Sequence, residues 1–350
     1  TDISEVHQEM GRPVTVLLRD VESGCGGVGG RVGPATHRRE SQGVGSGFFT
    51  RCGNRRERSK SDGHDGGAGH GRDCVAAVEV IWARMPRPEP VEYYNRYSGE
   101  IEEEEIYGEG FLRFTYGNPL GALTLWAAVK RRWFSRWYGW RMRRTASAKK
   151  VRPFVKEFGL DPEEFVTPPR KFEHFDAFFT RKLRPEARPV DPDPASVVFP
   201  ADGRHLAVAD LSTCEGLWAK GQRFDLPRLL GDPARAERYG DGVALVSRLC
   251  PTDYHRFHFP CAGVTSTPEL INGTLSSVNP IALRQRDAYL WENTRVLTEI
   301  ESPALGKVTM VEVGATCVGG IVQTYLTGPV EKGEEKGYFH YGGSMTIVLL

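Results

Sequence analysis

The residues best suited to chemistry lie in three short segments, each next to a predicted turn. The first segment is FPADGR, residues 199–204, in which Asp202 and Gly203 follow an apolar pair. An Asp–Gly pair favours a tight turn, because Asp can bond to its own backbone and Gly tolerates positive φ. Asp202 is therefore either a reactive carboxylate presented at a turn or part of a plain surface turn.

The second segment is DYHRFHFP, residues 253–260, which places His255 and His258 three positions apart among aromatic residues. In a strand the two side chains would point to opposite faces, whereas in a turn or helix they would share a side. Two such histidines could act as general bases or bind a metal. No matching Cys or His pair occurs at ligand spacing elsewhere, which disfavours a metal. A catalytic pair and a structural pair both stay open.

The third segment is KGEEKGYFHYGGSMTIVLL, residues 332–350, where Gly342, Gly343 and Ser344 precede a β-branched, aliphatic run. This pattern predicts an open turn followed by a strand. It is either an ordinary glycine hairpin or a strained peptide whose carbonyl the Ser344 hydroxyl can reach, because no Cβ blocks the approach. The GxSxG motif of serine hydrolases is absent, since Thr346 follows Met345 where that motif has glycine.

Residues 197–350 are predicted to form the body that positions these segments. Short apolar runs at 243–250, 306–322 and 344–350 alternate there with Gly and Pro turns. This pattern is typical of mostly antiparallel β-structure. A Pro-rich connector at 184–200 marks the boundary with a helical region before it. We therefore expect an α+β fold with a β-rich body and an N-terminal helical region.

The helical region is predicted to occupy residues 85–183. It begins with a polar lead, and we expect its acidic run at 102–105 to face solvent. Helical patterns follow at 147–166, with Ser147 as the cap, and at 175–183.

Residues 119–144 are the most unusual stretch of this region. Pro119 suits a helix start. Large side chains recur at three- and four-residue spacing on one helical face, namely Trp126, Val129, Trp133, Trp137 and Trp140. Seven basic residues and no acidic residue accompany them. Trp beside Arg and Lys is typical of a helix lying in a membrane interface near anionic lipid, which we expect here. The alternative is a helix that packs its Trp face on the core.

The composition excludes several classes of protein. The 350 residues contain 46 Lys and Arg against 45 Asp and Glu, a net charge of +1 that argues against a nucleic-acid partner. No run reaches the roughly 18 apolar residues of a membrane span, and the first residues lack the pattern of a signal peptide. Seven cysteines without a CxxC pair fit reduced thiols.

Residues 1–84 differ from the rest of the chain. They hold 16 of the 40 glycines but only three aromatic residues. Such a segment buries too little apolar surface to offset its ordering entropy. We expect a disordered or spurious extension without function. A transit peptide is disfavoured because the segment contains eleven acidic residues, whereas transit peptides contain few.

Taken in order, eight motifs resemble those of the phosphatidylserine decarboxylase family. They are FFTRKLRPEARPV (178–190), FPADGR (199–204), KGQRFDLPRLLG (220–231), DYHRFHFPCAG (253–263), SSVNPIA (276–282), ENTRV (292–296), VEVGATCVGGI (311–321) and KGEEKGYFHYGGS (332–344). The resemblance runs from about residue 93 to the last residue, and the shared order makes it specific. It implies a self-processing proenzyme with a pyruvoyl prosthetic group, whose catalytic domain is 197–350.

The resemblance also implies a role for each candidate residue. Asp202 matches the family's acid, His258 its general base and Ser344 its nucleophile. His255 matches a residue at the substrate head group, and either histidine could return a proton to the product. Cleavage between Gly343 and Ser344 would give a β chain ending at Gly343 and an α chain starting with a pyruvoyl made from Ser344. That group would form a Schiff base with phosphatidylserine and act as the electron sink when CO2 leaves. No metal is implied.

Two alternatives and two departures accompany the resemblance. The alternatives are a pyruvoyl decarboxylase of another serine phospholipid and a membrane-binding homologue that does not process itself. Met345 stands where the family usually has Thr or another small polar residue, and we expect cleavage to tolerate it. The family's chain continues further, so we expect the α chain to be truncated at Leu350. The implied location is the cytoplasmic face of the cell membrane, as a peripheral protein that binds the bilayer through 119–144.

Overall fold

The computed structural model describes residues 15–16 and 90–350, except 105, 107–108, 118, 126–130, 214–223, 317–319 and 343. Apart from Thr15–Val16, which form the short strand β1, the segment 1–84 lies outside the described residues. Trp126, Val129 and Gly343 lie outside them as well. The prediction of a disordered extension therefore stays a prediction.

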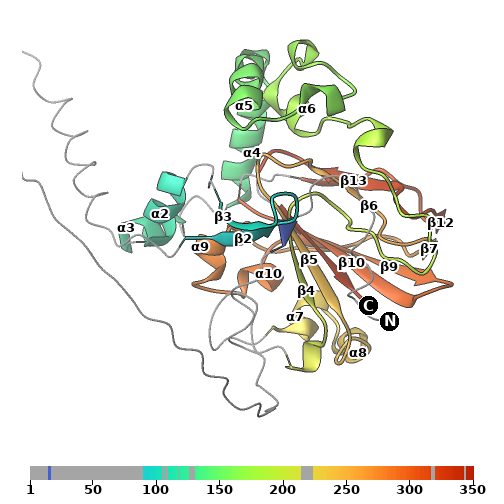
Figure 1. Cartoon of the computed structure of the whole chain (residues 1–350). Coiled ribbons are helices and arrows are strands. Elements are labelled where there is room, and N and C mark those ends of the chain that lie inside the picture. The colour runs from blue at the N-terminus through green and yellow to red at the C-terminus, as the bar shows by residue number, and fades with distance from the viewer. Residues whose placement is uncertain are drawn as a thin grey trace, which may run out of the picture. The chain divides into compact units, whose positions relative to one another are not determined.

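Two β-sheets form the body of the fold (Figure 1). The strands are β1 (Thr15–Val16), β2 (Glu92–Asn95), β3 (Glu100–Glu103), β4 (Arg204–Val208), β5 (Ala244–Leu249), β6 (Arg256–His258), β7 (Gly263–Thr265), β8 (Glu269–Ile271), β9 (Arg295–Ser302), β10 (Gly306–Gly314), β11 (Ile321–Gln323), β12 (Pro329–Val330), β13 (Glu335–Phe339) and β14 (Ser344–Leu349). Within the described residues, the larger sheet has the order β12-β7-β9-β10-β14-β5-β4-β1-β2-β3, with β8 beside β9. The smaller sheet has the order β11-β13-β6. All these pairs are antiparallel except β1–β4, which confirms the predicted antiparallel body.

Short helices precede the body in the sequence, and others lie between its strands. They are α2 (Glu109–Gly117), α3 (Pro119–Thr124), α4 (Arg132–Met142), α5 (Val151–Glu157), α6 (Phe175–Phe179), α7 (Leu226–Leu230), α8 (Pro233–Glu237), α9 (Pro280–Leu283) and α10 (Tyr289–Glu292). Single 3-10 segments are η3 (Thr145–Lys150), η4 (Pro162–Glu164), η5 (Pro169–Lys171), η6 (Pro185–Ala187) and η7 (Leu211–Thr213). Several begin at an Asp or Asn cap followed by Pro, as α7, α8 and α9 do at Asp225, Asp232 and Asn279. The side-chain oxygen of such a cap accepts a free N–H of the first turn, and Pro has no N–H to leave unpaired there.

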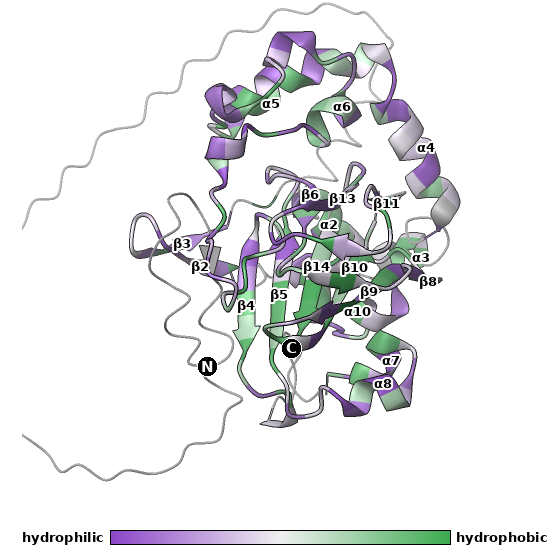
Figure 2. Cartoon of the chain, turned by 90° about the vertical axis from the view of Figure 1, so that its right-hand side faces the viewer, coloured by the Kyte–Doolittle hydropathy of each residue, from purple (hydrophilic) through white to green (hydrophobic). Residues whose placement is uncertain are grey.

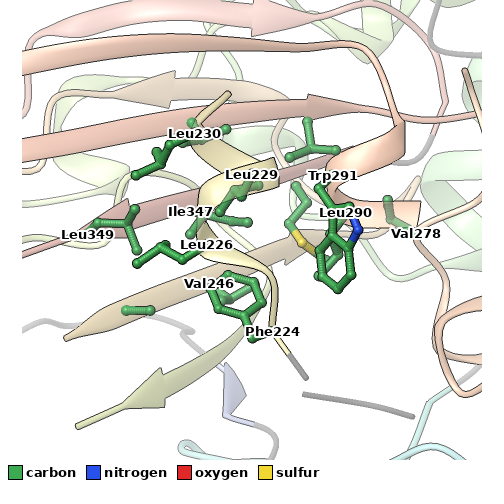
Figure 3. Close-up of a cluster of buried hydrophobic side chains, with 14 of the residues drawn as sticks. Phe224, Leu226, Leu229, Leu230, Val246, Val278, Leu290, Trp291, Ile347 and Leu349 are labelled. Carbon is green, nitrogen blue, oxygen red and sulfur yellow. The ribbon is translucent and has the colours of Figure 1, made fainter. Parts of the chain in front are cut away.

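Strand β14 is the centre of the body. It pairs with β10 on one side and β5 on the other, and all six of its residues are buried. Met345, Ile347 and Leu349 belong to a core formed with α7 and α10, part of which Figure 3 shows. Val348 faces the second core, which lies between the two sheets and includes Phe257. Burial on both faces explains why this run is almost continuously apolar instead of alternating.

The polar lead of the helical region differs from its prediction. Residues 92–103 form the β2–β3 hairpin, which extends the large sheet. Glu104 is buried instead of facing solvent, and it forms an ion pair with Arg248 and a hydrogen bond from Cys250. The prediction of a solvated acidic run is therefore wrong for Glu104. A charged side chain can be buried when a group of opposite charge pairs with it. Arg248, the partner of Glu104, is 144 residues away in the sequence, so no local pattern indicates the pair.

Ser147 also differs from its predicted role as a helix cap. Its hydroxyl is buried, donates to the Met142 carbonyl at 2.7 Å and accepts the Phe175 N–H at 2.8 Å. The side chain therefore joins the end of α4 to the start of α6. The helix predicted at 175–183 is confirmed as α6, although it ends at Phe179.

The Trp-rich stretch is described as two helices, α3, which begins at Pro119 as predicted, and α4. On α4 the side chains of Trp133, Trp137 and Trp140 are 59%, 46% and 51% exposed, so this face does not pack on the core. Met142, on the other side of the helix, is 2% exposed. Figure 2 shows α4 with mixed polar and apolar colouring, in contrast to the apolar centre of the large sheet. No helix in the described part of the chain is long and apolar enough to cross a bilayer.

Candidate active site

Ser344 lies where the glycine turn enters the central strand. It is the first residue of β14, opposite Gly314 of β10 and Leu249 of β5, and it is fully buried. Its hydroxyl has no hydrogen-bond partner among the described residues. A buried hydroxyl without a partner costs about 1–3 kcal/mol, and Ser344 differs from Thr346, which is in the same condition, by the glycine turn directly before it. The sequence predicted both the strand and the open turn before it.

Two of the predicted turns depend on glycine. Gly342, two residues before Ser344, has a φ of 142°, which L-residues with a side chain rarely adopt. Gly203, which follows Asp202, has a φ of 149°, and a Cβ there would lie 2.3 Å from the carbonyl oxygen of Arg248. The Asp–Gly turn predicted at 202–203 is thereby confirmed.

His255 is fully buried beside the glycine turn. Its Nδ1 donates to the Asp253 carbonyl at 3.0 Å, and its Nε2 faces the Gly342 backbone without a well-formed hydrogen bond to any described residue. The ring packs on Phe179 at 3.7 Å between centroids. Burial and the nearby charge of Arg181 lower the pKa of His255 to about 3, an effect that the Gly342 backbone opposes only in part. This histidine is therefore neutral at pH 7.

His258 lies in a different setting, on the wall of a cavity. Its Nδ1 donates to the Gly333 carbonyl at 2.9 Å, so Nε2 is the nitrogen left to act as a base. The cavity has a volume of about 280 Å³, and Asp202, Arg188, Arg184 and Tyr254 also line it. Burial lowers the pKa of His258, while the charges of Glu335 and Asp202 work in the opposite direction.

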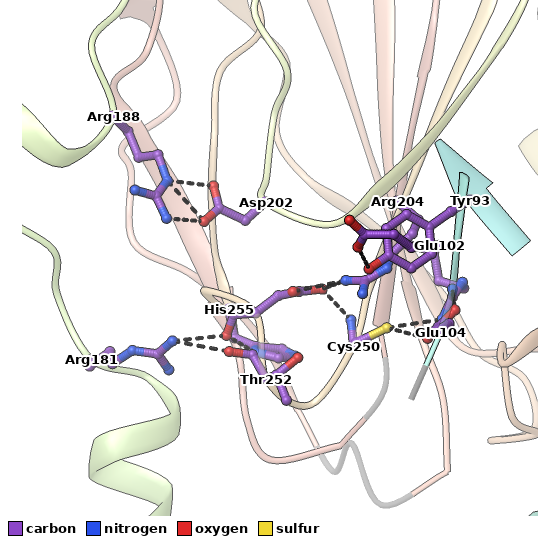
Figure 4. A network of polar contacts seen from close by, with 12 residues as sticks. Tyr93, Glu102, Glu104, Arg181, Arg188, Asp202, Arg204, Cys250, Thr252 and His255 are labelled. Carbon is purple, nitrogen blue, oxygen red and sulfur yellow. Dashed lines mark hydrogen bonds and ion pairs between the residues drawn. The ribbon is translucent and has the colours of Figure 1, made fainter. Parts of the chain in front are cut away.

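Asp202 faces the same cavity but is paired with an arginine (Figure 4). Arg188 donates to both carboxylate oxygens, and its Nη2 lies 2.6 Å from Oδ2. Arg188 also contacts Glu164 at 3.2 Å. No hydrogen bond joins Asp202 to His258 in the described part of the chain. The carboxylate therefore acts on His258 through its charge across the cavity.

The structure thus divides the predicted site residues into two groups. Asp202 and His258 share the cavity, whereas His255 lies beside the turn that leads to Ser344. Among the described residues, neither histidine forms a hydrogen bond with the Ser344 hydroxyl. Gly343 lies outside the described residues. No group of three or more His, Cys, Asp or Glu that could hold a metal ion occurs in the described part of the chain.

The sequence reasoning missed two residues that shape this site. Arg188, which binds Asp202, lies within one of the quoted motifs, so its position could have been flagged. Asp176 binds the turn at residues 340–341 through both carboxylate oxygens, and nothing in the local sequence around it indicates this contact.

Comparisons with known proteins identify the family to which this fold and these motifs belong. The family model described as phosphatidylserine decarboxylase matches residues 175–350. A relative from Fusobacterium nucleatum is 41% identical over 262 residues, which cover 75% of this chain and 87% of the relative. Relatives from Desulfitobacterium hafniense and Clostridium botulinum are 40% and 39% identical over 259 residues, 74% of this chain and 87% and 88% of theirs. The chain belongs to the phosphatidylserine decarboxylase family.

Each of these three relatives is named a phosphatidylserine decarboxylase proenzyme. Members of the family are thus decarboxylases that are processed from a precursor. The family match covers the body with its three chemical segments, and it begins at α6, the helix that carries Asp176.

Proposed function

We propose that this chain decarboxylates phosphatidylserine to phosphatidylethanolamine and CO2, after cleaving itself between Gly343 and Ser344. The observation that carries the proposal is the buried hydroxyl of Ser344, which makes no hydrogen bond to any described residue and directly follows a glycine turn in a member of this family. Such a hydroxyl is free to attack the neighbouring backbone, because no hydrogen bond has to be broken first.

The proposed cleavage uses the chain's own atoms. A histidine removes the proton from the Ser344 hydroxyl, and the oxygen attacks the Gly343 carbonyl carbon. The Gly343–Ser344 C–N bond then breaks, the proton passes to the freed amine, and the two segments are joined by an ester. Removal of the Ser344 Cα proton expels the Gly343 carboxylate. Water then hydrolyses the remaining dehydroalanine to a pyruvoyl group and ammonia.

The residues present fit a pyruvoyl group at position 344. Its precursor hydroxyl is fully buried, and the Nε2 of His255, a buried residue beside the Gly342 turn, makes no hydrogen bond to a described residue. When formed, this group supplies an electron sink for the pair of electrons left when CO2 departs.

The two histidines suit different tasks. Burial lowers the pKa of His258, so its ring is neutral near pH 7 and can accept a proton as a general base, while the charges of Glu335 and Asp202 stabilise the protonated ring that results. His255 is neutral, and its Nε2 suits a hydrogen bond to the reacting group or the substrate head group. Asp202 lines the same cavity as His258 and is held in place by its ion pair with Arg188. Its carboxylate can therefore stabilise positive charge on His258 across the cavity.

The exposed face of the helical region supports a membrane contact. Besides the three exposed Trp of α4, Phe111 of α2 and Leu120 and Leu123 of α3 are 47%, 62% and 58% exposed. Arg141 and Arg144 stack over Trp137 and Trp140 at 5.9 and 4.5 Å. Indole rings beside guanidinium groups suit the head-group layer of an anionic membrane. We propose a peripheral protein at the cytoplasmic face of the cell membrane.

A change of the α4 aromatic face should weaken membrane binding. The combined variant Trp133→Ala/Trp137→Ala/Trp140→Ala should bind vesicles of anionic phospholipid at least ~10-fold more weakly, because the interfacial area of three indoles is lost. Vesicle co-sedimentation measures this. The double variant Leu270→Ala/Leu326→Ala is the control, since it removes two other exposed apolar side chains, 58% and 89% exposed, from the β-body. Equal binding by both variants and the parent would contradict the membrane contact.

The function itself is tested with phosphatidylserine vesicles. The protein should release CO2 and form phosphatidylethanolamine, and mass spectrometry should show the chain divided at position 343. An intact chain with an unmodified Ser344 would instead favour the alternative of a membrane-binding homologue without processing. Parallel assays with vesicles of other serine phospholipids test the remaining alternative, a pyruvoyl decarboxylase that prefers a different serine phospholipid.

A further inference from the structure

Asp176, the second residue of α6, holds the turn that precedes the proposed cleavage site. Its Oδ1 accepts the backbone N–H of Tyr341 at 3.0 Å, and its Oδ2 lies 2.9 Å from Nδ1 of His340. The carboxylate is 4% exposed, although it is charged. One buried side chain therefore fixes two successive residues that lie three and four positions before Ser344.

The residues of the turn are fixed on their other sides too. Tyr341 is 5% exposed, stacks on Tyr138 at 5.5 Å and packs edge-on against Phe175 at 5.4 Å. The backbone N–H of His340 donates to the Gly320 carbonyl at 3.1 Å. The turn is thus held between the helical region and the sheet, and it ends at Gly342, whose φ is positive.

Asp176 is ionised in this position. Burial alone would raise the pKa of its carboxyl, but the hydrogen bond and charge of His340, the Tyr341 N–H and the nearby Arg143 together lower it below the usual value. An ionised acceptor forms stronger hydrogen bonds than a neutral one, so both contacts to the turn are of the strong kind.

We propose that Asp176 is a positioning residue for self-cleavage: it fixes the turn at residues 340–342 so that the Ser344 hydroxyl can reach the Gly343 carbonyl. The inference rests on the proposed cleavage between Gly343 and Ser344. Its reason is geometric, because an attack on a neighbouring carbonyl depends on sub-ångström placement, and glycines leave the backbone free to move away from it. Within the described residues, the hydrogen bonds of its carboxylate go to His340 and Tyr341 and not to Ser344, so its role is to position the turn.

Three variants test this role, with the rate of chain cleavage measured by intact mass spectrometry. Asp176→Ala removes both contacts and should slow cleavage at least ~10-fold. Asp176→Asn keeps an oxygen that can accept the Tyr341 N–H, so its rate should lie between those of Asp176→Ala and the parent. Asp232→Ala removes a similar Asp at the start of α8, whose side chain accepts the Ala234 N–H at 2.9 Å, and should cleave at the parent rate.

Hydroxylamine distinguishes slow formation of the ester from slow elimination after the ester has formed, because it cleaves the ester but not the peptide bond. If Asp176 acts before the ester forms, hydroxylamine should leave the slow Asp176→Ala variant slow. Restoration of the parent rate by hydroxylamine would overturn the inference, and so would parent-rate cleavage of either Asp176 variant. Should Asp176→Ala fail to fold, as judged by thermal unfolding, the isosteric Asp176→Asn decides by the same criteria. Failure of the proposed function would appear as an uncleaved parent chain, whereas failure of this inference appears only in the variants.

Discussion

The Ser344→Ala variant should remain one uncleaved chain of 39.0 kDa and should release no CO2 from phosphatidylserine vesicles. The change removes the oxygen that attacks the Gly343 carbonyl, and no pyruvoyl group can form from alanine. The rate of cleavage should fall at least ~10³-fold, the order of loss found when a nucleophile is removed. Intact mass spectrometry after prolonged incubation measures it.

Thr346 provides a matched control two residues further along β14. Its hydroxyl is also fully buried and also lacks a hydrogen-bond partner among the described residues, but no glycine pair precedes it. Thr346→Val should cleave at the parent rate, since removing an unpartnered buried hydroxyl in an isosteric exchange is close to neutral. Normal cleavage of Ser344→Ala, or loss of cleavage in Thr346→Val alone, would show that the nucleophile has been misassigned.

The second large effect concerns the two histidines. His258→Ala should block cleavage, because the base that activates Ser344 is lost. His255→Ala should still cleave but decarboxylate ~10²-fold more slowly, the usual range for a lost proton-transfer or hydrogen-bonding group. His174→Asn is the control, because His174 caps α6 by accepting the Ala177 N–H and Asn can do the same. The opposite result would assign the base role to His255, whose free Nε2 lies beside the Gly342 turn.

The dependence of cleavage on pH tests the same assignment. A general base must be neutral to accept a proton, and burial lowers the pKa of His258 below the ordinary histidine value of about 6.5. Cleavage should therefore proceed at a constant rate from pH 8 to pH 7 and decline only below that ordinary value. A decline that begins between pH 8 and pH 7 would require a base with a raised pKa and would exclude His258.

The elements that carry the chemistry were predictable because their signals are local. The Asp202–Gly203 turn, the glycine turn and strand β14 each follow from the types of a few consecutive residues. Position 344 could be singled out because glycines, a serine and an apolar run are adjacent in the chain. Such short-range patterns reflect the backbone preferences of glycine and the run of apolar residues, both of which can be read from consecutive positions.

The polar contacts were not predictable because they join distant parts of the chain. Asp202 matches the family's acid, but nothing in the sequence indicates that Arg188 is its hydrogen-bonding partner; a guanidinium group binds a carboxylate more strongly than a neutral imidazole does. Glu104 was expected in solvent but pairs with Arg248, and Asp176 reaches residues 340–341 across the fold. Ion pairs of this kind have no periodicity that a sequence alone reveals.

The position of β14 determines what cleavage does to the protein. The proposed break lies at the first residue of a strand that is hydrogen-bonded to a neighbour on each side and packed between two hydrophobic cores. One covalent bond is lost, but the ladders to β5 and β10 remain. The mature enzyme is then a non-covalent complex, held together like two fragments of a split protein that complement each other. The pyruvoyl group made from Ser344 would then lie at the start of β14, between β5 and β10 in the interior of the sheet.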